Sequence, residues 1–127
     1  MQNSKGMTMT GWILTAIPAL MLAAGGVMGL FHPPEMAKGF EHLGWPDRMA
    51  PILGVIELTC AVLYIFPRTA VLGAILITGY LGGATATHVR IGESTWFIPV
   101  LVGVVAWGGL FFRDARIRAL IPWNEKQ

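Results

Sequence analysis

Long runs of apolar residues, separated by short polar breaks, dominate the chain from end to end. Each run is close to the roughly 20 helical residues that cross a hydrocarbon core of about 30 Å. Two runs contain a proline, Pro18 and Pro99, which membrane helices tolerate when neighbouring groups satisfy the freed carbonyls. The pattern therefore predicts four transmembrane helices, at residues 12–31, 49–66, 70–89 and 96–112.

The polar segment between the first two runs, residues 32–48, has a pattern of its own. It opens with a Pro-Pro pair, which ends the preceding helix. Apolar residues then recur at helical intervals: Met36, Phe40 and Leu43. This spacing predicts a short amphipathic helix that lies on the membrane surface or caps the bundle.

The composition indicates a chain that mostly faces lipid rather than water. Of its 127 residues, 54% are hydrophobic and 13% charged, whereas a soluble domain carries about 25% charged residues. The formal net charge of +2 is too small and too scattered to predict nucleic-acid binding. The single cysteine, Cys60, allows no intrachain disulfide and no Cys-x-x-Cys redox pair. We expect an all-α transmembrane four-helix bundle that forms one domain over residues 1–127.

The distribution of Lys and Arg predicts how this bundle is oriented. With four spans, both termini and the short loop after the second span share one side, which carries six basic residues: Lys5, Arg68, Arg113, Arg116, Arg118 and Lys126. The other side carries three: Lys38, Arg48 and Arg90. Because basic residues accumulate on the cytoplasmic side, we expect both termini in the cytoplasm. The amphipathic helix then lies in the first outer loop.

Glu57 is the most unusual residue of the predicted spans. It lies about 12 Å into the second span at about 1.5 Å per residue, where a charged side chain costs about 2.5–3.5 kcal/mol. A carboxylate at that depth must face protein, pair with another group, meet water in a cavity, or carry a proton. Its helical face also holds Gly54, Ala61 and Tyr64. This face suits the protein interior, where Glu57 forms either a functional site or a structural hydrogen bond.

The third span places Tyr80 at a similar depth. Counted from the inner side, Tyr80 lies about 15 Å along its helix and Glu57 about 18 Å along its own. The Tyr80 hydroxyl could therefore donate to the Glu57 carboxylate. The alternative is a tyrosine that packs in the core with a backbone partner.

The stretch from Gly79 to Gly92, "GYLGGATATHVRIG", begins with small residues and ends with His88 and Arg90. Its small residues either let helices approach closely or leave room for a ligand. Thr85 and His88 are expected on one stripe at the outer end of the helix. There His88 could pass protons between water and a buried group, and Arg90 either binds a head group or only reaches the interface.

The sequence gives little support for a bound metal, haem or nucleotide. His32 ends the first span on the same outer side, but no helical His-x-x-x-His or Glu-x-x-His spacing indicates a metal site. A haem held by His32 and His88 is no better supported. Serine-nucleophile, phosphate-loop and dinucleotide motifs are absent from the sequence. We expect no metal.

In three motifs the chain resembles the DoxX-like family of small four-span bacterial membrane proteins. They are "LGWP" before the second span, "LGVIEL" with Gly54 and Glu57, and "GYLGGATATHVRIG" in the third span. The resemblance implies a multi-pass protein of the bacterial cytoplasmic membrane. The family is named after a subunit associated with thiosulfate oxidation that feeds electrons to quinone, and other relatives look like partners of oxidoreductases or assembly chaperones. Glu57, Tyr80, His88 and Arg90 fall at family-typical positions.

The leading hypothesis is a membrane subunit, associated with an oxidoreductase, that binds a lipophilic ligand such as a quinone in an outward-opening pocket. Glu57 and His88 are the candidate catalytic residues. The candidate ligand-binding residues are Gly54, Tyr80, Thr85, Arg90 and His32. One alternative is a stand-alone membrane enzyme that uses Glu57 and His88 as acid and base. Another is a non-catalytic assembly factor, or a homo-oligomer, whose polar residues contact another span. The ligand hypothesis predicts a cavity beside Glu57, whereas the assembly hypothesis predicts that Glu57 faces outward.

Overall fold

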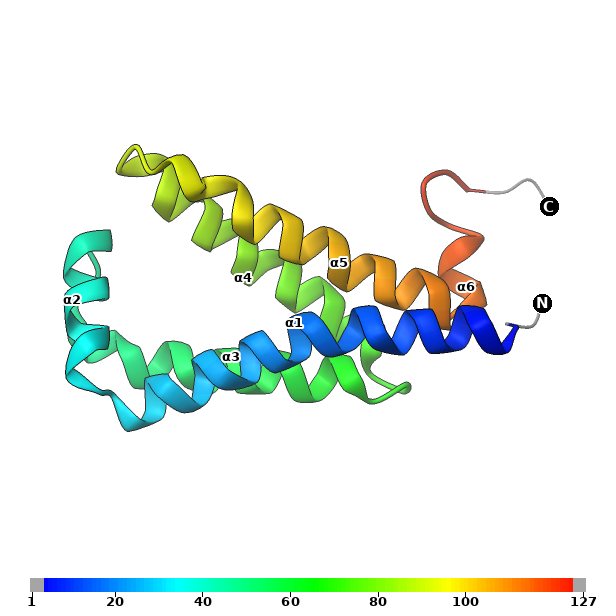
Figure 1. The fold of residues 1–127 in the computed structure, drawn as a ribbon, viewed down its shortest axis with the longest axis horizontal. Helices are drawn as coiled ribbons and strands as arrows, with labels where there is room; N and C mark the ends of the chain where they lie inside the picture. The colour runs from blue at the N-terminus through cyan, green and yellow to red at the C-terminus, as the bar shows by residue number, and fades with distance from the viewer. Residues whose placement is uncertain (1–3, 125–127) are drawn as a thin grey trace.

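The computed structural model describes residues 4–124 and is a bundle of four long helices (Figure 1). Their bounds are α1 Lys5–Phe31, α3 Ala50–Ile65, α4 Ala70–Arg90 and α5 Phe97–Arg113. Counted with the 3-10 turns that precede α3 and α5, Asp47–Met49 and Ser94–Trp96, each is long and apolar enough to cross a membrane. The predicted all-α bundle and its four spans are confirmed. The first helix starts at Lys5 rather than at Trp12, because the Ser4 side chain accepts a hydrogen bond from the Met7 amide and caps the helix there.

The four helices form two pairs that meet at one end and separate at the other. Helix α1 packs against α3 and α5, and α4 completes the ring by packing against the same two helices. In Figure 1 the α1–α3 pair and the α4–α5 pair lie close together near the termini and diverge away from them. We call these the closed end and the open end. Both termini lie at the closed end, as an even number of spans requires.

Glycines hold α1 and α3 together toward the open end. A Cβ atom added to Gly54 of α3 would lie 2.6 Å from the carbonyl oxygen of Gly26 in α1. One added to Gly29 would lie 2.7 Å from the carbonyl oxygen of Ala50. These helices approach each other at backbone distance, as small residues allow in membranes.

The core sits at the closed end. The buried residues of α4 all belong to its first half: Ala70, Gly73, Ala74 and Ile77. Tyr64 of α3 is fully buried, and its hydroxyl donates to the carbonyl oxygen of Ala106 in α5 at 2.5 Å. The Arg113 guanidinium donates to the carbonyl oxygen of Tyr64 at 2.7 Å and stacks over the ring of Trp12. Packing and hydrogen bonds therefore fix all four helices here.

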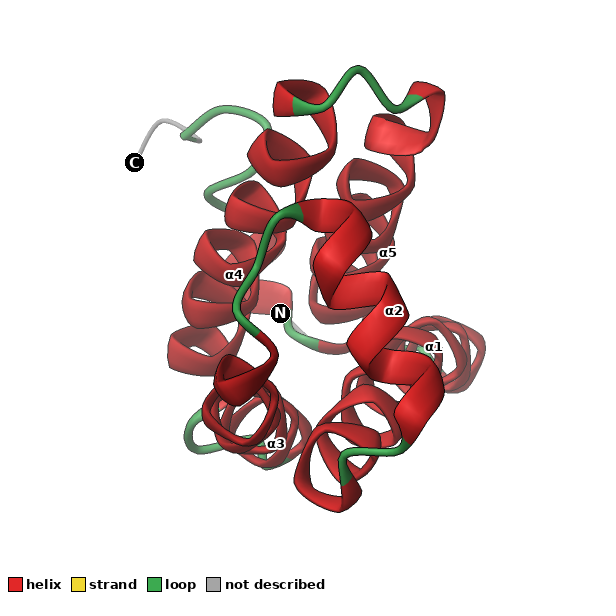
Figure 2. Ribbon diagram, turned by 90° about the vertical axis from the view of Figure 1, so that its left-hand side faces the viewer, coloured by secondary structure: helices red, strands yellow, loops and turns green. Residues whose placement is uncertain are grey.

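Helix α2, Pro34–Leu43, crosses the open end (Figure 2). It is the short helix that the polar segment predicts, and its apolar side chains Met36, Phe40 and Leu43 are partly buried. A 3-10 turn, Asp47–Met49, leads from it into α3. Three polar contacts hold this segment: His32 with Asp47 at 2.6 Å, His42 with Glu93, and the Arg90 guanidinium with the Leu43 carbonyl oxygen. We call residues 33–49 the cover.

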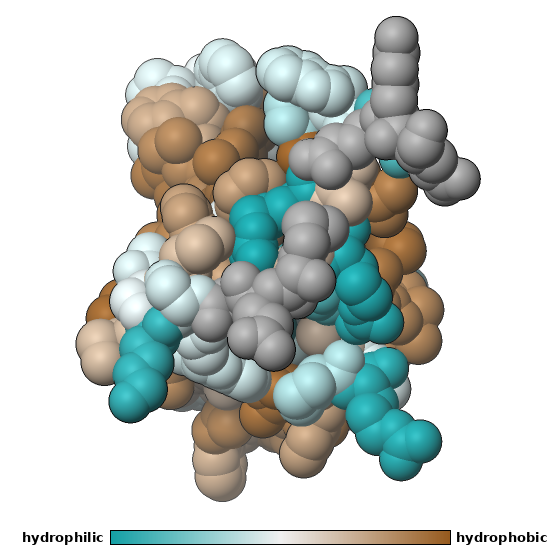
Figure 3. Space-filling model, turned by 90° about the vertical axis from the view of Figure 1, so that its right-hand side faces the viewer, coloured by the Kyte–Doolittle hydropathy of each residue, from teal (hydrophilic) through white to brown (hydrophobic). Residues whose placement is uncertain are grey.

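At the closed end a short helix, α6 (Ala115–Arg118), follows α5. The Asp114 carboxylate caps it by accepting from the amide of Arg116 at 3.0 Å, and it also accepts two hydrogen bonds from the Arg116 guanidinium. These bonds to Arg116 lower the pKa of Asp114 below its usual value. Figure 3 shows hydrophilic residues across the middle of this end and apolar residues along the flanks.

The flanks of the bundle are apolar and exposed. Large hydrophobic side chains face outward from every long helix, among them Leu20, Val55, Ile75 and Val104. A surface of this kind is stable against lipid tails and not against water. The protein is a multi-pass membrane protein whose flanks contact lipid.

Candidate functional site

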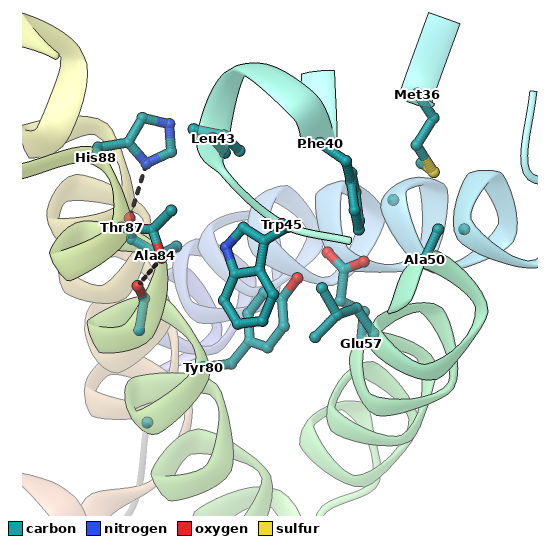
Figure 4. Close-up of a pocket in the computed structure, with 15 residues that line it drawn as sticks. Met36, Phe40, Leu43, Trp45, Ala50, Glu57, Tyr80, Ala84, Thr87 and His88 are labelled. Atoms are coloured by element: carbon teal, nitrogen blue, oxygen red, sulfur yellow. Dashed lines mark hydrogen bonds between the residues drawn. The ribbon is translucent and has the colours of Figure 1, made fainter. Parts of the chain in front are cut away.

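A cavity of about 410 Å³ lies at the open end, between the diverging helix pairs and under the cover (Figure 4). Its wall combines apolar side chains with a few polar ones. The lining residues are Gly25, Gly29, Met36, Phe40, Leu43, Trp45, Ala50, Leu53, Glu57, Gly79, Tyr80, Gly83, Ala84, Thr87 and His88. They come from α1, α2, the loop after α2, α3 and α4.

Glycines of α4 create this space. A Cβ atom added to Gly79 or Gly83 would meet no atom within 4 Å, although both residues line the cavity. Of the two alternatives for these small residues, close helix approach or room for a ligand, the described chain shows room at this pair. Because α4 leaves α3 beyond Ile77, the same small residues that would allow close packing leave room instead.

Glu57 projects from the middle of α3 into the cavity and is partly buried. Tyr80 projects from α4, and its hydroxyl points toward the Glu57 carboxyl group, with which it interacts as a hydrogen-bond donor (Figure 4). Directly beside the carboxyl, Gly25 of α1 provides the room that it needs, since a Cβ atom there would lie 2.8 Å from Oε1. Within residues 4–124, no ion pair involves Glu57.

His88 lines the same cavity about two turns beyond Tyr80 along α4. Its Nδ1 bonds the carbonyl oxygen of Ala84 at 2.7 Å. No hydrogen bond joins His88 to Glu57 in the part of the chain that the structure describes. In the view of Figure 4, the rings of Trp45 and Tyr80 lie between them. The two candidate catalytic groups thus share one cavity without touching.

These elements fall inside a region with known relatives. Residues 13–109 match the sequence profile of the DoxX-like family. The chain belongs to the DoxX-like family. No curated protein and no solved structure matches it significantly. Every residue that lines the cavity lies inside the matched region.

Four of the five predicted ligand-binding residues of this DoxX-like protein lie outside the cavity, and two of these, Gly54 and Thr85, belong to the body of the bundle. Gly54 is buried against α1, where it serves the close approach of the helices. Thr85 donates to the carbonyl oxygen of Leu81 at 2.8 Å and lines a second cavity, of about 520 Å³, between α4 and α5. The expected common stripe of Thr85 and His88 is therefore split between two sides of α4.

The other two, His32 and Arg90, bond the cover from outside it. His32 ends α1 in a left-handed conformation and bonds Asp47. Arg90 donates to the carbonyl oxygen of Leu43 and lies against Gly44, where a Cβ atom would be 2.9 Å from its Nη2. In this DoxX-like protein both side chains hold the cover in place, and neither lines the cavity.

Several lining residues carry no assignment from the sequence. Phe40 and Trp45 lie over the part of the cavity that holds the Glu57 carboxyl group (Figure 4). Thr87 lines the wall that α4 forms. The signal for Phe40 was the apolar face of the amphipathic segment, which fits a cavity roof as well as a membrane surface. Within residues 4–124, no group of three or more His, Cys, Asp or Glu side chains is arranged to hold a metal ion.

Proposed function

We propose that this membrane protein binds a lipophilic small molecule in the cavity at its open end, with the polar head of the molecule beside Glu57 and Tyr80. The observation that carries the proposal is the position of Glu57. Its carboxyl faces a cavity of about 410 Å³ whose other walls are mostly apolar. A cavity of this size and lining is typical of small-molecule sites, and intramembrane carboxyl groups generally serve function.

The roles follow from the positions of the side chains. Glu57 accepts a proton or a hydrogen bond from the head group, and Tyr80 orients the carboxyl by donating to it. His88 at the mouth exchanges protons with water, since imidazole is the side chain suited to that task near neutral pH. Arg90 and His32 act on the ligand only through the cover.

A quinone-type molecule and an oxidoreductase partner are the finer form of this proposal. An isoprenoid tail suits an apolar cavity with lipid-facing flanks, and a ring with two oxygen atoms suits a carboxyl–phenol pair. When bound, such a ring would supply two-electron redox chemistry. The side chains of this chain would bind it, exclude lipid from its polar edge and hold a proton at Glu57.

The test of the binding proposal is a mass spectrum of small molecules extracted from gently purified protein. Native protein should carry an apolar molecule in stoichiometric amount, and an isoprenoid quinone would identify the class. Gly83→Leu should lose it, because the new side chain fills the cavity. Gly82→Leu is the matched control, since Gly82 has equal room but lines the second cavity. Identical phospholipid spectra from all three proteins would refute the proposal.

A stand-alone enzyme is the second candidate, because Glu57 and His88 line one cavity from two sides and could act there as acid and base. It requires turnover by the purified chain without a partner. The assembly-factor hypothesis expects Glu57 on an outward face, and the carboxyl lies in the cavity instead, so we do not propose it.

We also propose that the protein lies in a bacterial cytoplasmic membrane with both termini in the cytoplasm. The six-to-three distribution of basic residues between its two sides supports this orientation. In a Cys60→Ser background, a membrane-impermeant thiol reagent should label Lys38→Cys in intact cells and Arg116→Cys only after permeabilisation. The reverse pattern would invert the orientation.

A further inference from the structure

The hydrogen-bond donors around the cavity are nearly all used by the protein itself. The Thr87 hydroxyl donates to the carbonyl oxygen of Gly83 at 2.8 Å. His88 Nδ1 must also donate, because its partner is the Ala84 carbonyl oxygen, which can only accept. In the neutral ring, Nε2 of His88 is therefore an acceptor.

The same holds deeper in the cavity. The Tyr80 hydroxyl is directed at Glu57, and an ionised carboxylate only accepts. The Arg90 guanidinium bonds the cover and does not line the cavity. Within residues 4–124, the indole N–H of Trp45 is the one side-chain donor of the lining that has no partner, and Trp45 is 38% exposed.

The cavity thus offers a ligand mainly lone pairs, from the Glu57 carboxyl, the Tyr80 and Thr87 oxygens and His88 Nε2. A head group that donates satisfies them. A head group that only accepts leaves these lone pairs facing other lone pairs, and a buried polar group without a partner weakens binding. Resting on the proposed function, we propose that the cavity selects lipophilic molecules whose head donates hydrogen bonds, a hydroxyl or an amine, over those whose head only accepts.

For a quinone-type ligand this means preference for the reduced, dihydroxy form over the oxidised form, whose ring oxygens are acceptors only. For an amine it means a charge-assisted bond to the Glu57 carboxylate. Both kinds of ligand carry an N–H or O–H donor on an apolar body. The experiment below distinguishes the hydroxyl ligand from the amine ligand.

The test uses full-length protein in phosphatidylcholine nanodiscs at pH 8, without oxygen, with empty nanodiscs as the blank. The probes share one body: tert-butylhydroquinone, 4-tert-butylbenzylamine and 2-tert-butyl-1,4-dimethoxybenzene, which keeps the ring oxygens but has no donor. We expect at least one donor probe to bind ten times more tightly than the dimethoxy probe. The stronger of the two donors identifies the source.

Glu57→Gln sharpens this test, because the amide keeps the shape of the carboxyl and adds an N–H donor. The variant should bind the dimethoxy probe more tightly and the preferred donor probe less tightly, so that the tenfold preference shrinks to threefold or less. Glu35→Gln, an acidic residue outside the cavity, should leave all affinities unchanged.

Two failures are distinguishable. If the dimethoxy probe binds as tightly as both donors and Gly83→Leu abolishes that binding, the cavity binds ligands but the head-group preference is wrong. An unchanged preference in Glu57→Gln would likewise overturn it. If no probe binds native protein above the empty-disc blank, both this inference and the proposed function fail.

Discussion

The two ends of the bundle use the same residue types for opposite purposes. At the closed end, a Cβ atom on Gly109 would lie 2.6 Å from the Thr15 hydroxyl, whereas at the open end one on Gly83 would meet nothing. Tyr64 is fully buried against a backbone carbonyl, whereas Tyr80 lines a cavity and faces a carboxyl group. Between the two helix pairs, glycine and tyrosine therefore serve packing at the closed end and line the cavity at the open end.

The largest expected effect comes from adding one methyl group at each end. Gly109→Ala should lower the free energy of unfolding by about 1–3 kcal/mol, because the methyl overlaps atoms of Thr15 in a close-packed interface. Gly83→Ala should raise it by up to about 1 kcal/mol, because alanine is the better helix former and nothing is displaced. Thermal unfolding in detergent measures both. If both substitutions changed the free energy of unfolding in the same direction, the contrast between the two ends would be wrong.

Removing one hydroxyl at each end should separate stability from binding. Tyr64→Phe loses the hydrogen bond to Ala106 and should cost about 1 kcal/mol of stability. Tyr80→Phe should leave stability nearly unchanged and alter affinity for the donor probes, because its hydroxyl serves the Glu57 carboxyl. If Tyr80→Phe destabilises as much as Tyr64→Phe and binding is normal, Tyr80 is a core residue.

The cover should loosen when its guanidinium contact is lost. Arg90→Ala removes the hydrogen bond to the Leu43 carbonyl oxygen, which is worth about 1 kcal/mol. Amide hydrogen exchange in residues 34–43 should then quicken roughly fivefold, the equivalent of that energy, with no change in α3. Arg48→Ala, another basic residue of the outer side, is the control. Equal rates of amide hydrogen exchange in the two variants would mean that Arg90 does not hold the cover in place.

The smallest effect is a pH dependence at the closed end. Because hydrogen bonds from Arg116 lower the pKa of Asp114 in the folded state, its contribution to stability is present above the unfolded value and lost as the pH falls through the folded value. Asp114→Asn should therefore lower stability slightly at pH 7 and make no difference at pH 2. A difference that persists at pH 2 would mean that packing, not charge, is responsible.

The fold was predictable because each span is a local property of the chain. Runs of apolar residues predict membrane helices from length alone, and the spacing of Met36, Phe40 and Leu43 predicts the short helix without knowledge of its neighbours. The meeting of Glu57 and Tyr80 was also predictable, because rise per residue fixes depth in antiparallel spans. The structure brings these two side chains together.

The rest of the cavity depends on how whole helices sit relative to one another. Thr85 and His88 differ by about 60° around α4, so a small rotation decides whether they share a side. Arg90 is a helix-end cation by sequence, and its bond to Leu43 exists only because the cover lies nearby. Likewise, no local signal says that Gly79 and Gly83 face space, since the divergence of α4 from α3 creates it.

The unobstructed glycine wall of α4 has a consequence for how such proteins change over evolutionary time. At Gly79, Gly82 and Gly83 a Cβ atom can be added without displacing any neighbour, so a change from glycine to alanine there costs the fold little. Each single substitution there would reshape a cavity while the closed end, which holds the bundle together, stays intact. An architecture of this kind therefore lets the shape of a cavity change one residue at a time, with the scaffold unchanged.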